Sequence, residues 1–245
     1  MLRFFVSFVS FVSFVFFPLM RILVVAATWT EIEPLVAKLP GASDSGARLQ
    51  RCRYRGHDVD VLAAGVGMVA TAAWCSQALT RTAYDLALNF GVCGTFDRAI
   101  ELGTVVHVIA DRIAELGAED CDAFLTIQEL HLLEDDEFPF THGELINGNP
   151  PANAALRRLP TVTGITVNTV HGNLRSIAAV NARFSPRVES MEGAAFMYAC
   201  LVHRVAFAQV RAVSNVVEPR NRASWRMSDA VDNLRDTALS ILDHA

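Results

Sequence analysis

Short apolar runs that alternate with longer helical patterns restrict the fold of this chain more than any other feature. Strands are predicted at residues 21–27, 58–64, 85–90, 103–109, 164–170 and 206–214. Helices are predicted at 30–39, 67–82, 192–204 and 227–243, the last with its apolar side chains on one face. Strands that are apolar on both faces need helices on both sides of the sheet. The pattern therefore predicts an α/β fold: a single domain of three layers, α/β/α, around a central mixed sheet.

The domain is expected to span residues 20–245, because residues 1–19 form a hydrophobic leader with an FVS repeat and a single charge at Arg3. Three interpretations of the leader stay open: low-complexity sequence from an upstream start codon, a secretion signal, or a membrane anchor. No small-x-small cleavage site precedes Met20, and the apolar stretch is short for a spanning helix. Residues 21–27 already form a complete buried strand, which favours the first interpretation. Residues 134–151 are predicted to form a long surface loop.

Composition excludes several functional classes. The net charge of −5 leaves no basic excess for binding nucleic acid. Five irregularly spaced cysteines without a C-x-x-C pair predict reduced thiols and a cytoplasmic protein, not a disulfide framework or a zinc cage. The seven histidines are scattered. We expect no metal, no cofactor, no nucleic-acid partner and no membrane association.

Glycine-containing segments follow two of the predicted strands. Gly65-Val66-Gly67 opens a helix, and Gly91-Val92-Cys93-Gly94 is predicted to be a turn. The first does not complete a dinucleotide-binding motif, because no acidic residue closes a second strand at the expected distance. A tight turn explains either segment as well as the approach of a ligand does. Two such segments together favour a ligand site, because ligands of open α/β sheets bind at strand ends.

Two carboxylates and one amide occur at comparable places. Glu31 follows the first strand, Glu192 lies at a strand-to-helix junction, and Asn215 follows the last strand. Each alone has a structural explanation, because carboxylates stabilise helix N-termini and Asn often ends strands. Together they suit the cleavage of an N-glycosidic bond. That reaction needs a base for the attacking water, an anion near the sugar and a donor for the departing base.

Four segments resemble, in the same order, the active-site motifs of the nucleoside phosphorylase superfamily: residues 26–31, 89–94, 188–193 and 211–215. The resemblance implies a nucleoside phosphorylase-like fold and a small-molecule nucleoside substrate. It also implies a homo-oligomer with active sites near subunit interfaces. Methylthioadenosine/S-adenosylhomocysteine nucleosidases of this superfamily carry a water-activating Glu where Glu31 stands.

The resemblance also indicates which reaction and which base to expect. Phosphorylases have a phosphate-binding Arg before the Gly-x-x-Gly segment, whereas this chain has Asn89-Phe90, so hydrolysis is favoured over phosphorolysis. Adenine-specific members have Asp at the position of Asn215. An amide NH₂ can donate toward both N7 and O6, which predicts a 6-oxopurine, hypoxanthine or guanine.

Further segments resemble the futalosine hydrolases within the superfamily: residues 111–120, 167–173, 189–195 and 217–225. This resemblance implies hydrolysis of futalosine to hypoxanthine and dehypoxanthine futalosine, a step of menaquinone biosynthesis. The departures are the leader and Val92, where nucleosidases often have Ser.

Roles follow from the matched positions. Glu31 is expected to activate water, Glu192 to bind the ribose hydroxyls and stabilise positive charge, and Asn215 to hold hypoxanthine. The expected substrate-binding residues are Met191, Glu189, Gly91, Val92, Val167 and Val170. The substrate carboxylate needs a cation, for which Arg220, Arg222 and Arg226 are candidates, although a solvated face explains each equally well.

Three alternatives stay open: a 6-oxopurine nucleoside phosphorylase, a methylthioadenosine/S-adenosylhomocysteine nucleosidase, and a non-catalytic nucleoside-binding protein that the leader directs to the cell envelope. Phosphate dependence and the identity of the released base separate the first two from a futalosine-type hydrolase. Binding alone does not require two carboxylates, which disfavours the third.

Overall fold

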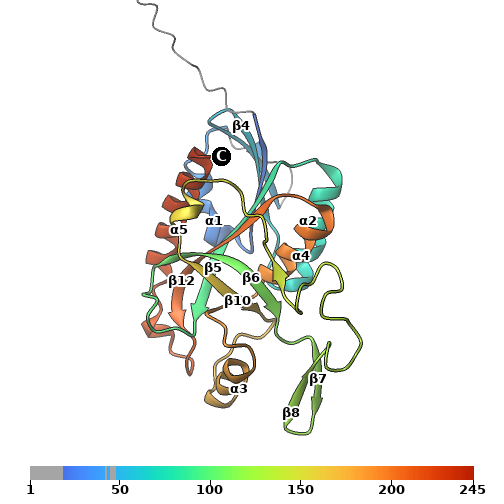
Figure 1. Ribbon diagram of the computed structural model, residues 1–245. Coiled ribbons are helices and arrows are strands. Elements are labelled where there is room, and N and C mark those ends of the chain that lie inside the picture. Colours follow the sequence, from blue (N-terminus) through green and yellow to red (C-terminus); the bar gives the residue numbers. More distant parts are fainter. Residues whose placement is uncertain (1–18, 42, 45–47) are drawn as a thin grey trace, which may run out of the picture.

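A mixed ten-stranded sheet forms the middle of the molecule within the residues that the computed structural model describes, 19–41, 43–44 and 48–245 (Figure 1). Its strands run in the order β11-β10-β6-β12-β5-β1-β4-β3-β2, and β9 pairs with β6. The strands are β1 (Arg21–Ala26), β2 (Ser43–Asp44), β3 (Leu49–Tyr54), β4 (His57–Ala63), β5 (Leu86–Thr95), β6 (Val105–Ile113), β9 (Leu145–Ile146), β10 (Thr161–Thr166), β11 (Val188–Ser190) and β12 (Phe207–Val216). A separate hairpin joins β7 (Gly117–Asp120) to β8 (Ala123–Thr126).

Helices cover both faces of the sheet, which confirms the predicted α/β/α layers (Figure 1). One face carries α1 (Trp29–Val36) and α5 (Met227–Asp243), and the other carries α2 (Met68–Arg81) and α4 (Gly193–His203). Each face of the sheet packs against its own hydrophobic core, and successive residues of β1 point alternately into the two. Val24 packs in the core that includes Leu234 of α5, and Val25 packs in the core that includes Phe196 of α4. This two-sided burial explains why the first strand is apolar throughout. A further helix, α3 (Leu174–Phe184), lies beyond β10.

One end of the sheet closes on itself. β11 pairs in parallel with β10 and in antiparallel with β5, so that β5, β12, β6, β10 and β11 form a closed ring of strands. The pairing sets Glu189 opposite Gly94. Segments that lie nearly a hundred residues apart in the chain therefore meet at one point.

The structure corrects the prediction of a turn at Gly91-Val92-Cys93-Gly94. These residues belong to β5, which continues to Thr95 because β12 pairs with it along this stretch and β11 pairs with its end. The strand predicted at 164–170 lies earlier, at Thr161–Thr166. Segments that sequence reasoning did not assign include α3 and β11.

The segment 134–151 is not a surface loop throughout, so this prediction was wrong. Phe140, Leu145 and Asn147 are buried, and β9 pairs with β6. The Asn147 side chain donates a 2.7 Å hydrogen bond to the backbone oxygen of Phe207. Two apolar side chains and one satisfied amide therefore hold this segment against the domain.

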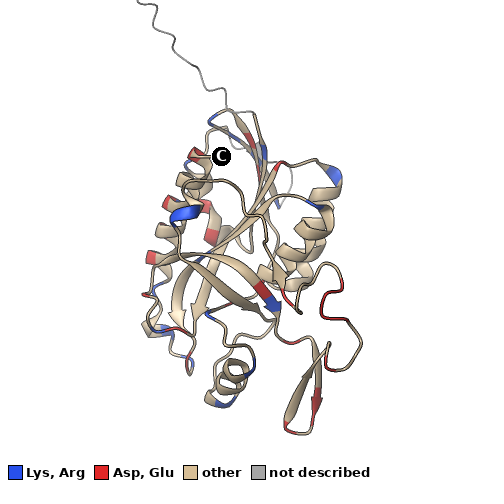
Figure 2. Cartoon of the chain, viewed as in Figure 1, with Lys and Arg blue, Asp and Glu red and all other residues tan. Residues whose placement is uncertain are grey.

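The predicted leader falls outside the described residues apart from Leu19. Within the described part of the chain, no helix has both the length and the apolar character that crossing a membrane requires. Acidic and basic residues are interspersed on the outer helices and loops (Figure 2). None of the five cysteines forms a disulfide, and only Cys121 is exposed.

Candidate active site

A cavity of about 410 Å³ lies where β1, β5 and β12 end and β11 joins them. Most of the predicted site residues line it: Glu31, Val92, Val170, Glu189, Met191, Glu192 and Asn215. The two glycine segments also meet there, because Val66 and Gly94 belong to the same lining. The closed end of the sheet thus gathers motifs that are scattered along the sequence.

Glu31 lies in the first turn of α1 and is held by three donors. Its Oε2 accepts hydrogen bonds from the backbone N–H and the hydroxyl of Thr28, both at 3.0 Å. The first of these is the contact by which an N3 carboxylate reaches the N-cap residue in a capping box. Its Oε1 accepts from the backbone N–H of Val92 at 3.2 Å. The carboxylate therefore starts the helix and also faces the cavity.

Glu192 stands immediately before α4 and is almost fully buried. Its Oε1 accepts a 3.1 Å hydrogen bond from the backbone N–H of Gly67. Burial raises the pKa of Glu192, while Arg211 and the N–H of Gly67 oppose that rise and Glu31 adds to it. The Gly65-Val66-Gly67 segment thus bonds to a catalytic candidate through its backbone.

Arg211 of β12 is a component of the site to which the sequence assigned no role. Its side chain is buried, and its Nη2 donates to Oδ1 of Asn89, whose Nδ2 donates to the backbone oxygen of Val25 at 3.0 Å. A Cβ at Gly91 would lie 3.0 Å from Nη1 of Arg211 and 3.3 Å from Oε1 of Glu31. Gly91 therefore lets a guanidinium approach the Glu31 carboxylate beneath the cavity floor. Arg211 opens the segment 211–215 that resembles an active-site motif, but the sequence assigned it no role.

Glu189 is paired with His171, so it is less available to a sugar than Glu192. Its Oε1 accepts from the backbone N–H of His171 at 3.0 Å, and its Oε2 lies in close contact with the ring Nδ1. Both residues are largely buried. The pair fastens the segment that carries Val170 to β11.

Asn215 is oriented by its own strand. The β12 register shifts between Val213 and Asn215, and the Ser214 hydroxyl donates to Oδ1 of Asn215 at 2.9 Å. Its Nδ2 donates to the backbone oxygen of Val216 at 3.0 Å, which leaves one N–H of the amide for a ligand. Gly94 makes room for this amide, because a Cβ there would lie 3.1 Å from Nδ2.

Gly91 and Val167 do not line the cavity. Gly91 lies below it, between Arg211 and Glu31. Val167 is fully buried in a small core with Ala114, Ile165 and Val180, and its N–H donates to the backbone oxygen of Ser190. Both residues therefore lie outside the cavity lining and support the residues that form it.

The three candidate cations differ in position. Arg220 lines the cavity beside Met227 and Val231, and its guanidinium lies 5.5 Å from the centre of the Trp225 ring. Neither Arg222 nor Arg226 lines the cavity; the latter is ion-paired with Asp229 at 3.4 Å. Among the described residues, Arg220 is thus the cation that faces the cavity.

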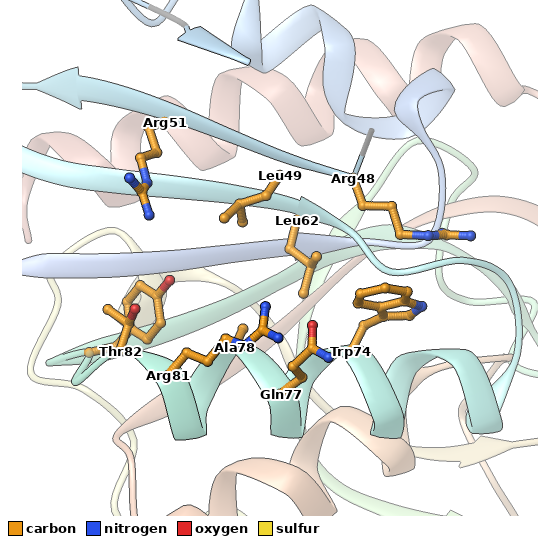
Figure 3. Close-up of a pocket in the computed structure, with 10 residues that line it drawn as sticks. Arg48, Leu49, Arg51, Leu62, Trp74, Gln77, Ala78, Arg81 and Thr82 are labelled. Atoms are coloured by element: carbon orange, nitrogen blue, oxygen red, sulfur yellow. The ribbon is translucent and has the colours of Figure 1, made fainter. Parts of the chain in front are cut away.

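A second hollow of about 430 Å³ lies between α2 and the β3–β4 pair (Figure 3). Arg48, Arg51 and Arg81 line it. The Arg48 guanidinium bonds to two backbone oxygens and stacks over Trp74, and Arg51 lies 3.8 Å from Asp60. No predicted site residue lines this hollow, and two of its three arginines have partners, so the first cavity is the candidate active site. No cluster of three or more metal-ligating side chains occurs in the described part of the chain.

Comparisons with known proteins agree with this geometry. The family model of the phosphorylase superfamily matches residues 21–244. A futalosine hydrolase of Streptomyces coelicolor is 34% identical over 224 residues, which cover 89% of this chain and 93% of the relative. A futalosine hydrolase of Thermus thermophilus is 32% identical over 71% of this chain and 76% of its own length. Among solved structures, a 5′-methylthioadenosine/S-adenosylhomocysteine nucleosidase of Colwellia psychrerythraea, in complex with adenine, superposes with a TM-score of 0.78 at 22% identity, covering 94% of this chain and 97% of that one.

Proposed function

Because the chain belongs to the phosphorylase superfamily and, within it, to the futalosine hydrolase family, we propose that it hydrolyses the N-glycosidic bond of futalosine. The products are hypoxanthine and dehypoxanthine futalosine, and the reaction belongs to menaquinone biosynthesis. The observation that carries the proposal is the convergence of two carboxylates, Glu31 and Glu192, and the amide of Asn215 on one cavity.

The reaction requires one water and no further reactant. Glu31 accepts a proton as the water oxygen bonds to C1′ of the ribose, and the electron pair of the C1′–N9 bond passes to the purine. Glu192 binds the ribose hydroxyls and stabilises the positive charge that develops on the sugar. The free N–H of Asn215 donates a hydrogen bond to the departing purine. The proton that the purine takes up is the one released from the attacking water, returned from Glu31 or through solvent, so the water supplies OH to C1′ and H to the base.

Water is favoured over phosphate as the nucleophile. The guanidinium of Arg211 is buried below Gly91 and bonded to Asn89, so it offers no paired donors to a phosphate in the cavity. The Glu31 and Glu192 carboxylates that line the cavity repel an anion. These two observations also disfavour a 6-oxopurine nucleoside phosphorylase.

A homo-oligomer in the cytoplasm is the proposed working form. Val69 of α2 and Tyr198 and Val202 of α4 are exposed apolar side chains on two helices that pack together. Val66, also exposed, lines the cavity as well. We define these four residues as the α2–α4 patch; because Val66 lines the cavity, an interface that buries this patch would lie beside the active site. The unpaired cysteines support a reducing compartment.

The test is a substrate comparison with the full chain in phosphate-free buffer. Futalosine, inosine and methylthioadenosine are incubated separately, and the released base is identified by chromatography. Hypoxanthine is expected from futalosine, at a rate that added phosphate does not change. Turnover that needs phosphate would establish a phosphorylase instead. Preferred release of adenine from methylthioadenosine would establish the other nucleosidase and contradict the role of Asn215.

A further inference from the structure

A buried carboxylate outside the cavity binds the start of the helix that follows Glu192. Asp111 of β6 is 1% exposed. Its Oδ2 accepts a 2.9 Å hydrogen bond from the side-chain amide of Gln209, and its Oδ1 accepts a 3.0 Å hydrogen bond from the hydroxyl of Thr166. The Thr166 oxygen in turn accepts from the backbone N–H of Ala194 at 2.8 Å. A chain of three buried hydrogen-bonding side chains thus joins β6, β12 and β10 to the first turn of α4.

The contact between this group and α4 is close enough to require a glycine. A Cβ at Gly193 would overlap Nε2 of Gln209 and Oδ2 of Asp111. The N–H of Gly193 donates to the Ser190 hydroxyl at 3.2 Å. The first residues of α4 therefore rest directly on the Asp111–Gln209 pair, with little space for an alternative position.

Met191 and Glu192 lie between these fixed points. Ser190, at the end of β11, accepts the backbone N–H of Val167, and Ala194 is held by Thr166. Both residues of the intervening turn line the cavity, whereas Asp111, Gln209 and Thr166 do not. Burial raises the pKa of Asp111 to about 6, and the charged side chain whose field reaches Asp111 and opposes that rise is Arg211 from β12.

We propose that Asp111, acting through Thr166 and Gln209, is a positioning residue that holds the first turn of α4 and so fixes Met191 and Glu192 in the active site. Asp111 would position the residues that carry out the hydrolysis proposed above, so this inference rests on the proposed function. The hydrogen bonds, and not the charge, carry the effect. An Asn at position 111 retains both bonds once the Gln209 amide turns, because Oε1 of Gln209, which lacks a partner among the described residues, then accepts from it.

Paired variants of the full chain test the proposal. Thr166→Val removes the hydroxyl that bonds Ala194 and Asp111, and Thr166→Ser keeps it. Asp111→Ala removes the acceptors, and Asp111→Asn retains the two bonds. Thr166→Val and Asp111→Ala are expected to lower kcat at least tenfold with KM changed less than threefold. The two conservative variants are expected to stay within threefold of wild-type kcat.

Tyr84→Phe is the matched control for a general loss of stability. It removes a buried 2.7 Å hydrogen bond to Asp60, in the second hollow away from the active site. Melting temperatures are measured for every variant. Tyr84→Phe is expected to lower the melting temperature by an amount similar to Thr166→Val and to leave kcat within twofold of wild type. An equal loss of kcat in this control would overturn the proposal.

Amide hydrogen exchange gives a readout that does not depend on the substrate. Peptides that cover residues 191–196 are expected to exchange at least tenfold faster in Thr166→Val, and unchanged in Tyr84→Phe. Unchanged exchange in Thr166→Val would overturn the inference whatever the wild type hydrolyses. If the wild type releases no hypoxanthine from futalosine, the proposed function fails, while the exchange result still decides the positioning role.

Discussion

Glu31 has a structural role at the start of α1 and, in the proposed mechanism, a chemical role as well. The Thr28 hydrogen bonds explain why it stands in the first helical turn, and the Val92 hydrogen bond shows that its other oxygen reaches β5. A capping carboxylate and a base for water use different lone pairs, so the two roles are compatible. The structural explanation that the sequence already offered for Glu31 is therefore correct without excluding catalysis.

Glu31→Gln is expected to abolish most activity without unfolding the protein. The Gln oxygen still accepts from Thr28, but the amide cannot take a proton from water, so kcat should fall by about three orders of magnitude. Steady-state kinetics with futalosine measure the effect. Glu33→Gln is the matched control, because Glu33 is an exposed carboxylate of the same helix. Full activity in Glu31→Gln would contradict the mechanism.

The raised pKa of Glu192 gives the reaction a predictable pH dependence. Burial is the main cause of the rise from the ordinary value of 4.5. The ionised form binds the sugar and its developing charge, so kcat/KM should fall as the pH is lowered through this raised pKa. The acid limb should therefore lie above pH 4.5. A pH–rate profile from pH 4.5 to 9 measures it. A profile that stays flat to its acid end would show that Glu192 is not the titrating group.

At the scale of elements, the segment between β12 and α5 sets the outer wall of the cavity. Arg220 lines this wall near Trp225, Met227 and Val231, where a substrate meets one cation in apolar surroundings. A guanidinium in such a place suits the benzoate-like carboxylate of futalosine. This observation distinguishes Arg220 from the other two arginines, which the sequence alone could not separate.

Arg220→Ala is expected to raise the KM for futalosine at least tenfold and to leave kinetics with inosine nearly unchanged. The reason is that inosine lacks the carboxylate that the guanidinium would bind. Arg222→Ala is the control, because its guanidinium also lies near the Trp225 ring, at 5.9 Å, without lining the cavity. A similar rise of KM for both substrates in Arg220→Ala would show that Arg220 contributes to packing and does not bind the substrate carboxylate.

The sequence predicted elements well where the pattern of apolar residues reports burial, on both faces of β1 and on one face of α5. The sequence-based prediction failed where the structure of a segment depends on the distant strands that pair with it. Gly91 and Gly94 suggested a turn, yet they lie in a strand because β12 and β11 pair with it there. They are glycines because Arg211 and Asn215 occupy the space that a Cβ would take. β11 has three residues, too few to show a period, and exists because β5 and β10 both pair with it. Arg211 was overlooked because a buried arginine inside an apolar run has no local signature.

At the scale of the whole molecule, closure of the sheet explains how short motifs become one site. The ring of β5, β12, β6, β10 and β11 brings the end of β5, which is paired with β12, against β11. β1 pairs with β5 on its other side and leads into α1, whose first turn carries Glu31. Ordering these segments costs conformational entropy, which the two buried cores offset. The sequence supplied the motifs, but the closure depends on pairings between residues as far apart as Gly94 and Asn215, about 120 positions along the chain.

Val69→Asp tests whether the α2–α4 patch joins copies of the chain. Val69 is 82% exposed, so burying its side chain against a second copy would remove an apolar surface from water, and an Asp there would oppose that burial. Size-exclusion chromatography with light scattering is expected to show an oligomer for the wild type and a smaller species for the variant. Because Val66 joins the patch to the cavity, kcat/KM should fall at least fivefold as well. Leu174→Asp is the control, since Leu174 is 71% exposed on α3. A monomeric wild type would refute the oligomer, and an unchanged mass for Val69→Asp would move the interface to another face.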